Sequence, residues 1–251
     1  MRIRWFFLGF VFLLGHSVFG ALNMDAIVEE IRLIVPTHSI PIRVNRPVFH
    51  FRVGQKVRKD LIRKDINQLM NMGVFSSVFV DSNMINNRHV LEYRVSFNPV
   101  VNDIKFSGNR TYDDQYLMRY FFNQINRPLS LNEIEDTRQS IYDLYISNGY
   151  SLYQLDKIDL IDNTLTCYLN EGYIGQISVD GLERFQSHSI LRNFVLKEGA
   201  VFNTEHLVLD RQNLQNSGYF SFVSLPIITK SKDNRFVNIR YKVIEKRLNL
   251  V

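Results

Sequence analysis

The stretch that decides the fold is residues 196–223, LKEGAVFNTEHLVLDRQNLQNSGYFSFV. Between Gly199 and Gly218 its apolar residues recur at helical spacing, and the alternating run that follows is typical of a strand. Asn203 has the side chain of a helix N-cap, and Gly218 suits the left-handed residue that closes a helix. The stretch therefore predicts a helix followed directly by a strand.

The same pattern is written three times along the chain. Residues 54–75 match residues 199–220 at an offset of 145, and the glycines at 54/73 and 199/218 are 19 residues apart in both copies. A middle copy, residues 126–149, is four residues longer, which is about one helical turn. A second match, residues 104–109 with 177–182, predicts a short strand and a turn ahead of the middle and last copies.

Each copy is therefore expected to have the order β-α-α-β-β, with a three-stranded mixed sheet and two helices on one face. The predicted fold class is α+β, with three tandem modules over residues 21–98, 99–172 and 173–247. The expected hairpins are Phe75–Val80 with Val90–Phe97, Tyr150–Leu155 with Thr164–Asn170, and Phe220–Leu225 with Phe236–Glu245. Ile31–Val35 is the candidate first strand of the first module.

The two ends of the chain lie outside the repeats. Residues 1–20 have the features of a secretory signal peptide, with Arg2 and Arg4 before the apolar run Trp5–Leu14 and cleavage expected before Ala21. An uncleaved anchor is the alternative, although the run is shorter than the roughly 20 residues that span a bilayer. Residues 248–251 are a short tail. We therefore expect an exported protein.

Charge and cysteine content further limit the possible partners of the chain and the bonds that can stabilise it. The net charge is +5, but residues 99–172 hold 11 acidic and 6 basic side chains, whereas 21–98 and 173–251 each hold 11 basic and 7 acidic ones. An acidic segment between two basic ones argues against nucleic acid as the partner. Cys167 is the only cysteine, so no intramolecular disulfide forms, and its apolar surroundings predict a buried thiol.

No pattern in the sequence is typical of an enzyme. The six histidines never pair at helical spacing, and the chain has no nucleophile elbow, phosphate loop or Cys-x-x-Cys. The acidic pairs at 113–114 and 135–136 fall in expected first helical turns, where acids favour the helix dipole. We expect no catalytic residue, no cofactor and no metal.

The repeat resembles a known family. Residues 196–203, leading to Asp210 and Gly218–Phe220, together with residues 104–109, resemble the POTRA (polypeptide-transport-associated) domains of BamA-type outer-membrane assembly proteins and chloroplast import pores. In that family the modules precede a membrane β-barrel, and residues 248–251 cannot form one. The resemblance therefore implies either a free-standing form without the barrel or a fragment of a barrel-containing protein.

The resemblance also implies a function. It suggests a periplasmic polypeptide-binding array, at the inner face of the outer membrane, that assists outer-membrane β-barrel protein assembly or protein translocation. The implied partners are unfolded or extended outer-membrane protein precursors, a membrane β-barrel or assembly lipoproteins, and peripherally the membrane. A scaffold role in a secretion or cell-division complex is the alternative, because one fold hosts several functions.

By the same resemblance, the second strand of each module is the candidate edge. The unpaired N–H and C=O groups of an edge strand can accept an extended peptide as a further strand. If Val78 and Val80 face the core with Phe75, then Ser77 and Phe79 face outward, unless neighbouring modules cover them. The candidate polypeptide-binding residues are Phe75, Ser77, Phe79, Tyr150, Leu152, Phe220, Phe222 and Ser224.

Overall fold

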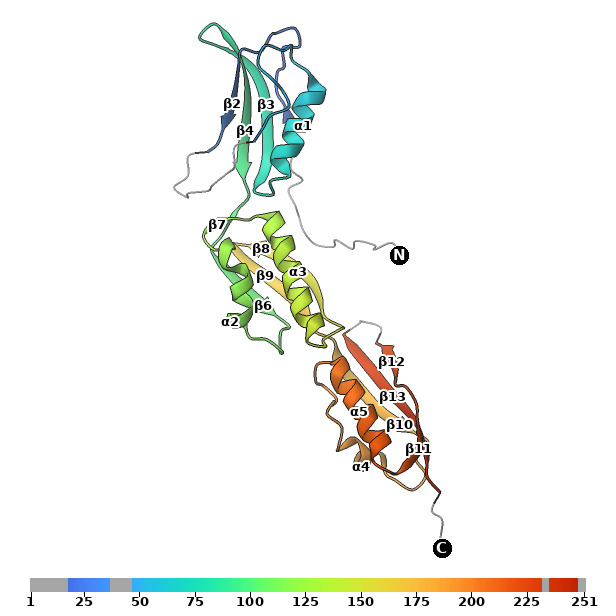
Figure 1. The fold of residues 1–251 in the computed structure, drawn as a ribbon. Helices are drawn as coiled ribbons and strands as arrows, with labels where there is room; N and C mark the ends of the chain where they lie inside the picture. Colours follow the sequence, from blue (N-terminus) through green and yellow to red (C-terminus); the bar gives the residue numbers. More distant parts are fainter. Residues whose placement is uncertain (1–17, 37–46, 232–234, 248–251) are drawn as a thin grey trace. The chain divides into compact units, whose positions relative to one another are not determined.

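The computed structural model describes residues 18–36, 47–231 and 235–247, and its fold is α+β (Figure 1). The described chain divides into two compact units. One unit comprises the residues up to 105 together with 118–137 and 158–166, and the other comprises 106–117, 138–157 and the residues from 167 onward. Most of the expected signal peptide, the turn at 232–234 and the tail at 248–251 lie outside the described residues.

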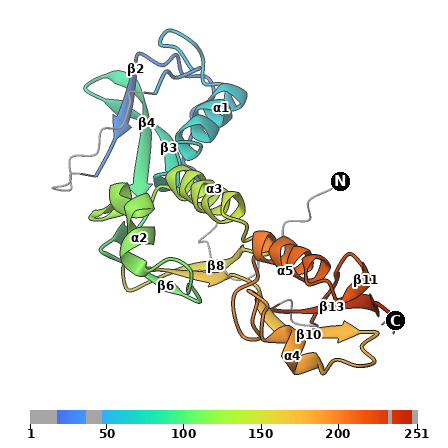
Figure 2. The same cartoon turned by 60° about the horizontal axis from the view of Figure 1, so that its bottom comes forward.

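The first sheet has the strand order β1-β3-β4-β2. Its long hairpin joins β3 (Phe75–Ile85) to β4 (Arg88–Phe97) through Asn86 and Asn87, which both have positive φ, as a tight hairpin turn requires. Strand β2 (Glu30–Ile34) and the short β1 (Val18–Phe19) pair parallel with β4 and β3 respectively. Helix α1 (Lys59–Met70) lies alongside β3 (Figure 2).

The middle sheet has the order β6-β9-β8, formed by β6 (Asp103–Ser107), β9 (Thr164–Asn170) and β8 (Gln154–Ile161). A separate small pair joins β5 (Val100–Val101) to β7 (Arg127–Pro128). The helices of this region are α2 (Asp114–Met118), the 3-10 helix η1 (Arg119–Gln124) and α3 (Leu131–Ser147).

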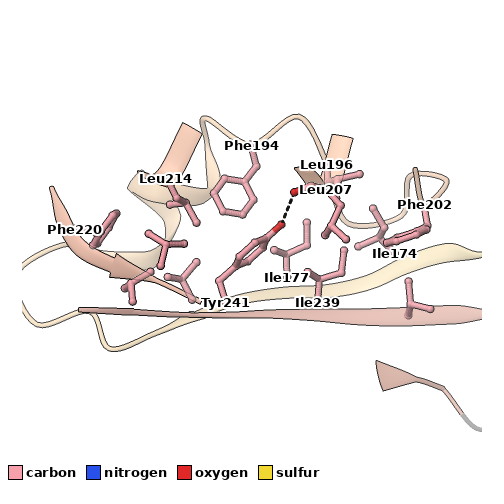
Figure 3. Packing of buried hydrophobic residues seen from close by; sticks show 14 residues of the cluster. Ile174, Ile177, Phe194, Leu196, Phe202, Leu207, Leu214, Phe220, Ile239 and Tyr241 are labelled. Atoms are coloured by element: carbon pink, nitrogen blue, oxygen red, sulfur yellow. Dashed lines mark hydrogen bonds between the residues drawn. The ribbon is translucent and has the colours of Figure 1, made fainter. Parts of the chain in front are cut away.

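The third sheet places β13 (Phe236–Glu245) at its centre. Strand β10 (Tyr173–Asp180) is parallel to it, whereas β11 (Phe220–Val223) and β12 (Ile227–Lys230) both pair antiparallel with its other side. The two helices are α4 (Ser187–Leu191) and α5 (Thr204–Asn216). Figure 3 shows the core between the strands and the helical side, with the Tyr241 hydroxyl donating to the Leu207 carbonyl at 3.4 Å.

In two of the repeats, a buried carboxylate on the helix before the hairpin (α1 or α5) binds the loop that precedes this helix. Asp65 accepts a hydrogen bond from the Phe51 N–H at 3.1 Å, and Asp210 accepts one from the Leu196 N–H at 3.0 Å. Both carboxylates are fully buried, and the offset of 145 relates the two donors as well as the two acceptors. A buried acid without such donors would cost several kcal/mol, so the loop and the helix are fixed together.

A second carboxylate recurs at the end of the last strand. Glu171 accepts from the Thr111 N–H at 3.1 Å, and Glu245 accepts from the Arg184 N–H at 3.0 Å. In both cases the acid fixes the turn that follows the first strand of its sheet, where Gly108 or Gly181 has positive φ. The periodicity read from the sequence is thus repeated in the hydrogen bonds.

The predicted α+β class is confirmed, with two kinds of difference in detail. The first and third sheets each carry a fourth strand, β1 and β12, so three strands were too few. Between the first strand and its hairpin, the described part of residues 21–98 contains a single helix, α1, rather than two. Among the described residues, no helix is both long enough and apolar enough to cross a bilayer.

Candidate functional site

The segment before the helix that leads to the hairpin pairs with residues at the start of the first strand or just before it. The Gly54 N–H donates to the Val28 carbonyl at 2.8 Å, and the Gly199 N–H donates to the Ile174 carbonyl at 2.7 Å. In the middle repeat, the pairing of β5 with β7 does the same for the residues that lead into β6. These pairings cover only the beginning of this side in each repeat, and among the described residues no strand pairs with the outer side of β2 or β6. The opposite edges belong to the second strands, β3, β8 and β11–β12.

The edge of β3 is partly closed by the chain itself. Strand β1 pairs with it in parallel, the Gly20 N–H donates to the Val80 carbonyl at 2.8 Å, and the Ser82 N–H donates to the Ala21 carbonyl at 3.4 Å. The approach is tight, because a β-carbon on Gly20 would lie 2.7 Å from the β-carbon of Asp81. This added strand was not predicted, because it comes from the end of the expected signal peptide.

The side chains of β3 divide between the two faces as predicted. Phe75, Val78 and Val80 are buried, whereas Ser77 and Phe79 are half-buried on the opposite face. A register shift between residues 75 and 77 explains why Phe75 and Val78, three residues apart, both point inward. Phe79 also lies 6.0 Å from the guanidinium carbon of Arg94.

The edge of β8 begins later than predicted, which corrects the placement of Tyr150 and Leu152. Both precede the strand, in a turn closed by hydrogen bonds from the Tyr150 N–H to the Tyr145 carbonyl and from the Tyr153 N–H to the Tyr150 carbonyl. Tyr153 stacks on Tyr145 with ring centroids 4.0 Å apart, which fixes the turn. Leu152 packs against the third core. Neither residue can offer an edge to a peptide.

Strand β12 is the most exposed of the three edges, since all four of its residues are exposed. Figure 1 shows it beside β13. The Ser231 N–H donates to the Phe236 carbonyl at 2.8 Å, toward β13. Because the backbone direction alternates along an antiparallel strand, the Thr229 N–H also faces β13, and those of Ile228 and Lys230 face away from the sheet. These two outward N–H groups are what an added strand would pair with.

Apolar side chains accompany this edge. Phe222 on β11 is 53% exposed and stands opposite Ile244 of β13, which is 58% exposed. Leu225, in the break between β11 and β12, is 73% exposed. The expected outward position of Phe222 is therefore observed, whereas Phe220 is buried in the core and can contribute only its backbone.

The break between β11 and β12 corrects the predicted strand Phe220–Leu225. Strand β11 ends at Val223, so Ser224 lies just beyond it, where its N–H donates to the Lys242 carbonyl at 2.8 Å. Pro226 separates the two strands, since proline cannot donate to a ladder. The candidate residues missed in the sequence are 227–230, although the β-branched pair Ile227-Ile228 directly after a proline was the available signal.

Electrostatics fix the end of this sheet. Burial opposes ionisation of Glu245, but hydrogen bonds from the backbone N–H groups of Glu183, Arg184 and Phe185 and from the Arg184 guanidinium outweigh it, so its pKa is lowered to about 2. The Arg184 Nε lies 2.9 Å from the carboxylate. Among the described residues, no three His, Cys, Asp or Glu side chains gather as metal ligands would.

Comparison with solved structures places the fold among known proteins. The chain is similar to the N-terminal domain of Omp85 from the thermophilic cyanobacterium Thermosynechococcus elongatus, with 22% identity, a TM-score of 0.77, and coverage of 89% of this chain and 98% of that one. It is also similar to POTRA1-3 of the periplasmic domain of Omp85 from Anabaena, with 21% identity, a TM-score of 0.62, and coverage of 88% and 96%. A search among curated proteins gave no significant match.

A family model supplies the assignment that fold similarity at this identity cannot. The POTRA model, described as a surface antigen variable number repeat, matches residues 99–172 and 172–246. These two matches cover more than half of the 251 residues. Together with the repeated hydrogen bonds and the strand order of the sheets, they establish that the chain belongs to the POTRA family.

Proposed function

We propose that this chain is a periplasmic polypeptide-binding array that assists outer-membrane β-barrel protein assembly or protein translocation, without enzymatic activity. Membership of the POTRA family supports the polypeptide-binding role. The similar Anabaena structure is part of a periplasmic domain of Omp85, which supports a periplasmic location; we place the array at the inner face of the outer membrane. In this proposal the array consists of three modules, at 21–98, 99–172 and 173–247, and its clients are extended outer-membrane protein precursors.

The observation that carries the proposal is the uncovered edge of β12. Within the described part of the chain, no strand pairs with the outward N–H groups of Ile228 and Lys230, and Phe222 lies exposed on the adjoining β11. An extended client would add as a further strand along this edge, and alternate client side chains would meet the apolar ones.

Such binding is expected to be weak. Each net backbone hydrogen bond contributes about 0.5–1.5 kcal/mol. Two to four of them, less the cost of ordering the peptide, give a dissociation constant on the order of millimolar to high micromolar. A weak edge releases its client, and several edges on one chain raise the avidity.

The edge is tested with proline in place of one outward donor. The probe is a synthetic ten-residue peptide of alternating apolar and polar residues, and binding is followed by amide chemical shifts of the full chain. Lys230→Pro should weaken binding about fivefold or more, because it removes one outward N–H and places a ring in the path of the peptide. Lys230→Ala, the matched control, keeps the N–H and should bind within about twofold of the parent.

Two outcomes would contradict the proposal. One is equal binding by Lys230→Pro and Lys230→Ala with the fold intact. The other is a set of chemical-shift changes that leaves residues 220–230 unaffected in the parent chain.

A further inference from the structure

The second helix of a repeat docks on the glycine that closes the helix of the preceding repeat, and this happens twice. The Leu131 N–H, at the start of α3, donates to the Gly73 carbonyl at 2.9 Å. The Thr204 N–H, at the start of α5, donates to the Gly149 carbonyl at 2.8 Å. Each contact lies within one of the two compact units. The repetition marks this contact as a built feature of the junctions.

A carboxamide side chain completes each contact. The Asn132 Nδ2 donates to the Asn71 carbonyl at 2.9 Å, and the Asn203 Nδ2 donates to the Asn148 carbonyl at 2.9 Å. Asn203 at the same time caps its own helix, because its Oδ1 accepts from the Glu205 N–H at 2.8 Å. The docked group is therefore a helix N-terminus that carries an asparagine.

Both junctions need a glycine on the receiving side. A β-carbon on Gly73 would lie 2.9 Å from the Asn132 Cγ, and one on Gly149 would lie 2.7 Å from the Asn203 Oδ1. Both glycines have positive φ, of 75° and 84°. The positive φ of the turn and the close approach of the asparagine side chain thus both require glycine at these two positions.

Gly218 is the third copy of this receiving glycine, and its surroundings are open. It follows Gly73 by 145 residues and has φ of 80°. A β-carbon on it would meet no heavy atom of the described residues within 4 Å, and none of these residues donates to its carbonyl. The strand end beside it repeats the first module, since the Lys246 N–H donates to the Tyr219 carbonyl as the Asn98 N–H does to that of Val74.

Charge indicates what kind of domain would dock there. Lys242, Lys246 and Arg247 are exposed near this end of the third sheet. The corresponding helix start in the first repeat carries the exposed Arg58 and Lys59 with one exposed acid, Asp60, so the front of a second copy would bring a net positive charge toward these cations. The segment that docks on Gly73, residues 99–172, is acidic, with 11 acidic and 6 basic side chains.

We propose that the end of the third repeat around Gly218 is a docking surface for an acidic domain that presents a helix N-terminus with an asparagine in its first turn. The Gly218 carbonyl accepts the first helical N–H, and the Asn216 carbonyl accepts the carboxamide, as the carbonyls of Gly73 and Asn71 do at the internal junction. The inference concerns a surface distinct from the β12 edge and does not depend on peptide binding there.

The test uses the chain's own acidic segment as the probe. Residues 99–247 of a second copy are joined after Lys246, which occupies the place of Asn98. Asn216→Cys in the first copy and Asn132→Cys in the attached copy are then cross-linked with a short reagent. Asn71→Cys with Asn132→Cys in the ordinary chain is the positive control, since those positions are adjacent, and Cys167 is buried.

The test pair should cross-link in a yield like that of the control pair. Adding Gly218→Asn should lower the yield about fivefold, because asparagine tolerates positive φ but fills the space that the docking turn needs. An equal yield with and without Gly218→Asn, or no cross-link, would overturn the proposal. Analytical ultracentrifugation of the unmodified chain should find a monomer. If the chain instead self-associates and Gly218→Asn abolishes this self-association, the surface binds a second copy, and the proposal of an acidic partner domain is overturned.

Discussion

The second strands of the first and third sheets occupy the same place in their repeats, yet their edges differ. The edge of β3 carries the short parallel strand β1, and the Val80 carbonyl is paired with Gly20. Among the described residues, no strand pairs with the outer edge of β12, and all four residues of β12 are exposed. The first sheet thus illustrates how an extended segment adds to the edge of a second strand. In the third sheet, the corresponding edge has no such added segment among the described residues.

The largest expected effect is a difference in the free energy of unfolding between proline variants at inward-facing and outward-facing N–H groups of β12. Thr229→Pro removes an N–H that faces β13 and should destabilise the fold by about 2 kcal/mol, whereas Lys230→Pro should cost less than about 1 kcal/mol. Urea unfolding of both variants checks the difference. Equal losses would mean that the alternation inferred from Ser231 does not extend along the strand.

A chain that begins at Ala21 makes the two edges alike. Without Gly20 the Val80 carbonyl loses its donor, and the adjoining backbone of β3 loses its cover. Exchange of the Val80 amide should then accelerate about tenfold, the change expected for about 1.4 kcal/mol of lost protection. Unchanged exchange would show that the β1 pairing is not maintained in solution.

Acid should affect the third sheet through Glu245, the last residue of β13. Because the pKa of Glu245 falls from 4.5 to about 2 on folding, its contribution to stability is present above about pH 4.5 and is lost as the pH falls through about 2. Glu245→Gln should therefore lower the melting temperature at pH 7, and its difference from the parent should shrink toward pH 2. A difference that does not depend on pH would exclude this role.

The smallest expected effect is at the exposed aromatic side chain of the open edge. Phe222→Ser should change the free energy of unfolding by no more than about 0.5 kcal/mol, because the ring is more than half exposed on the outward face. A loss above about 1 kcal/mol in chemical unfolding would indicate that this face is covered in the folded chain.

Much of this comparison was visible in the sequence. The 145-residue offset predicted the helices after residues 58 and 203, and the alternation from residue 236 to 245 gave the bounds of β13. These elements follow from local periodicity and capping, which short stretches of sequence carry.

The parts that sequence could not predict depend on pairing between distant segments. Nothing local to Val18–Phe19 indicates that it pairs with β3, 61 residues further along the chain. The late start of β8 depends on the stacking of Tyr153 on Tyr145, and the direction of each edge N–H depends on register shifts such as that between Phe220 and Phe222. A shift of one residue reverses which donors face outward, so the binding groups were identified only from the ladder.

The single thiol has a consequence for the chain under oxidising conditions. Cys167 lies inside β9, the central strand of the middle sheet, and burial raises its pKa to about 12. At neutral pH the sulfur is therefore neither accessible nor ionised, and it resists oxidation. Two molecules can form an intermolecular disulfide only when that strand separates from its neighbours. The rate of disulfide-linked dimerisation in air would therefore report how often the middle core opens.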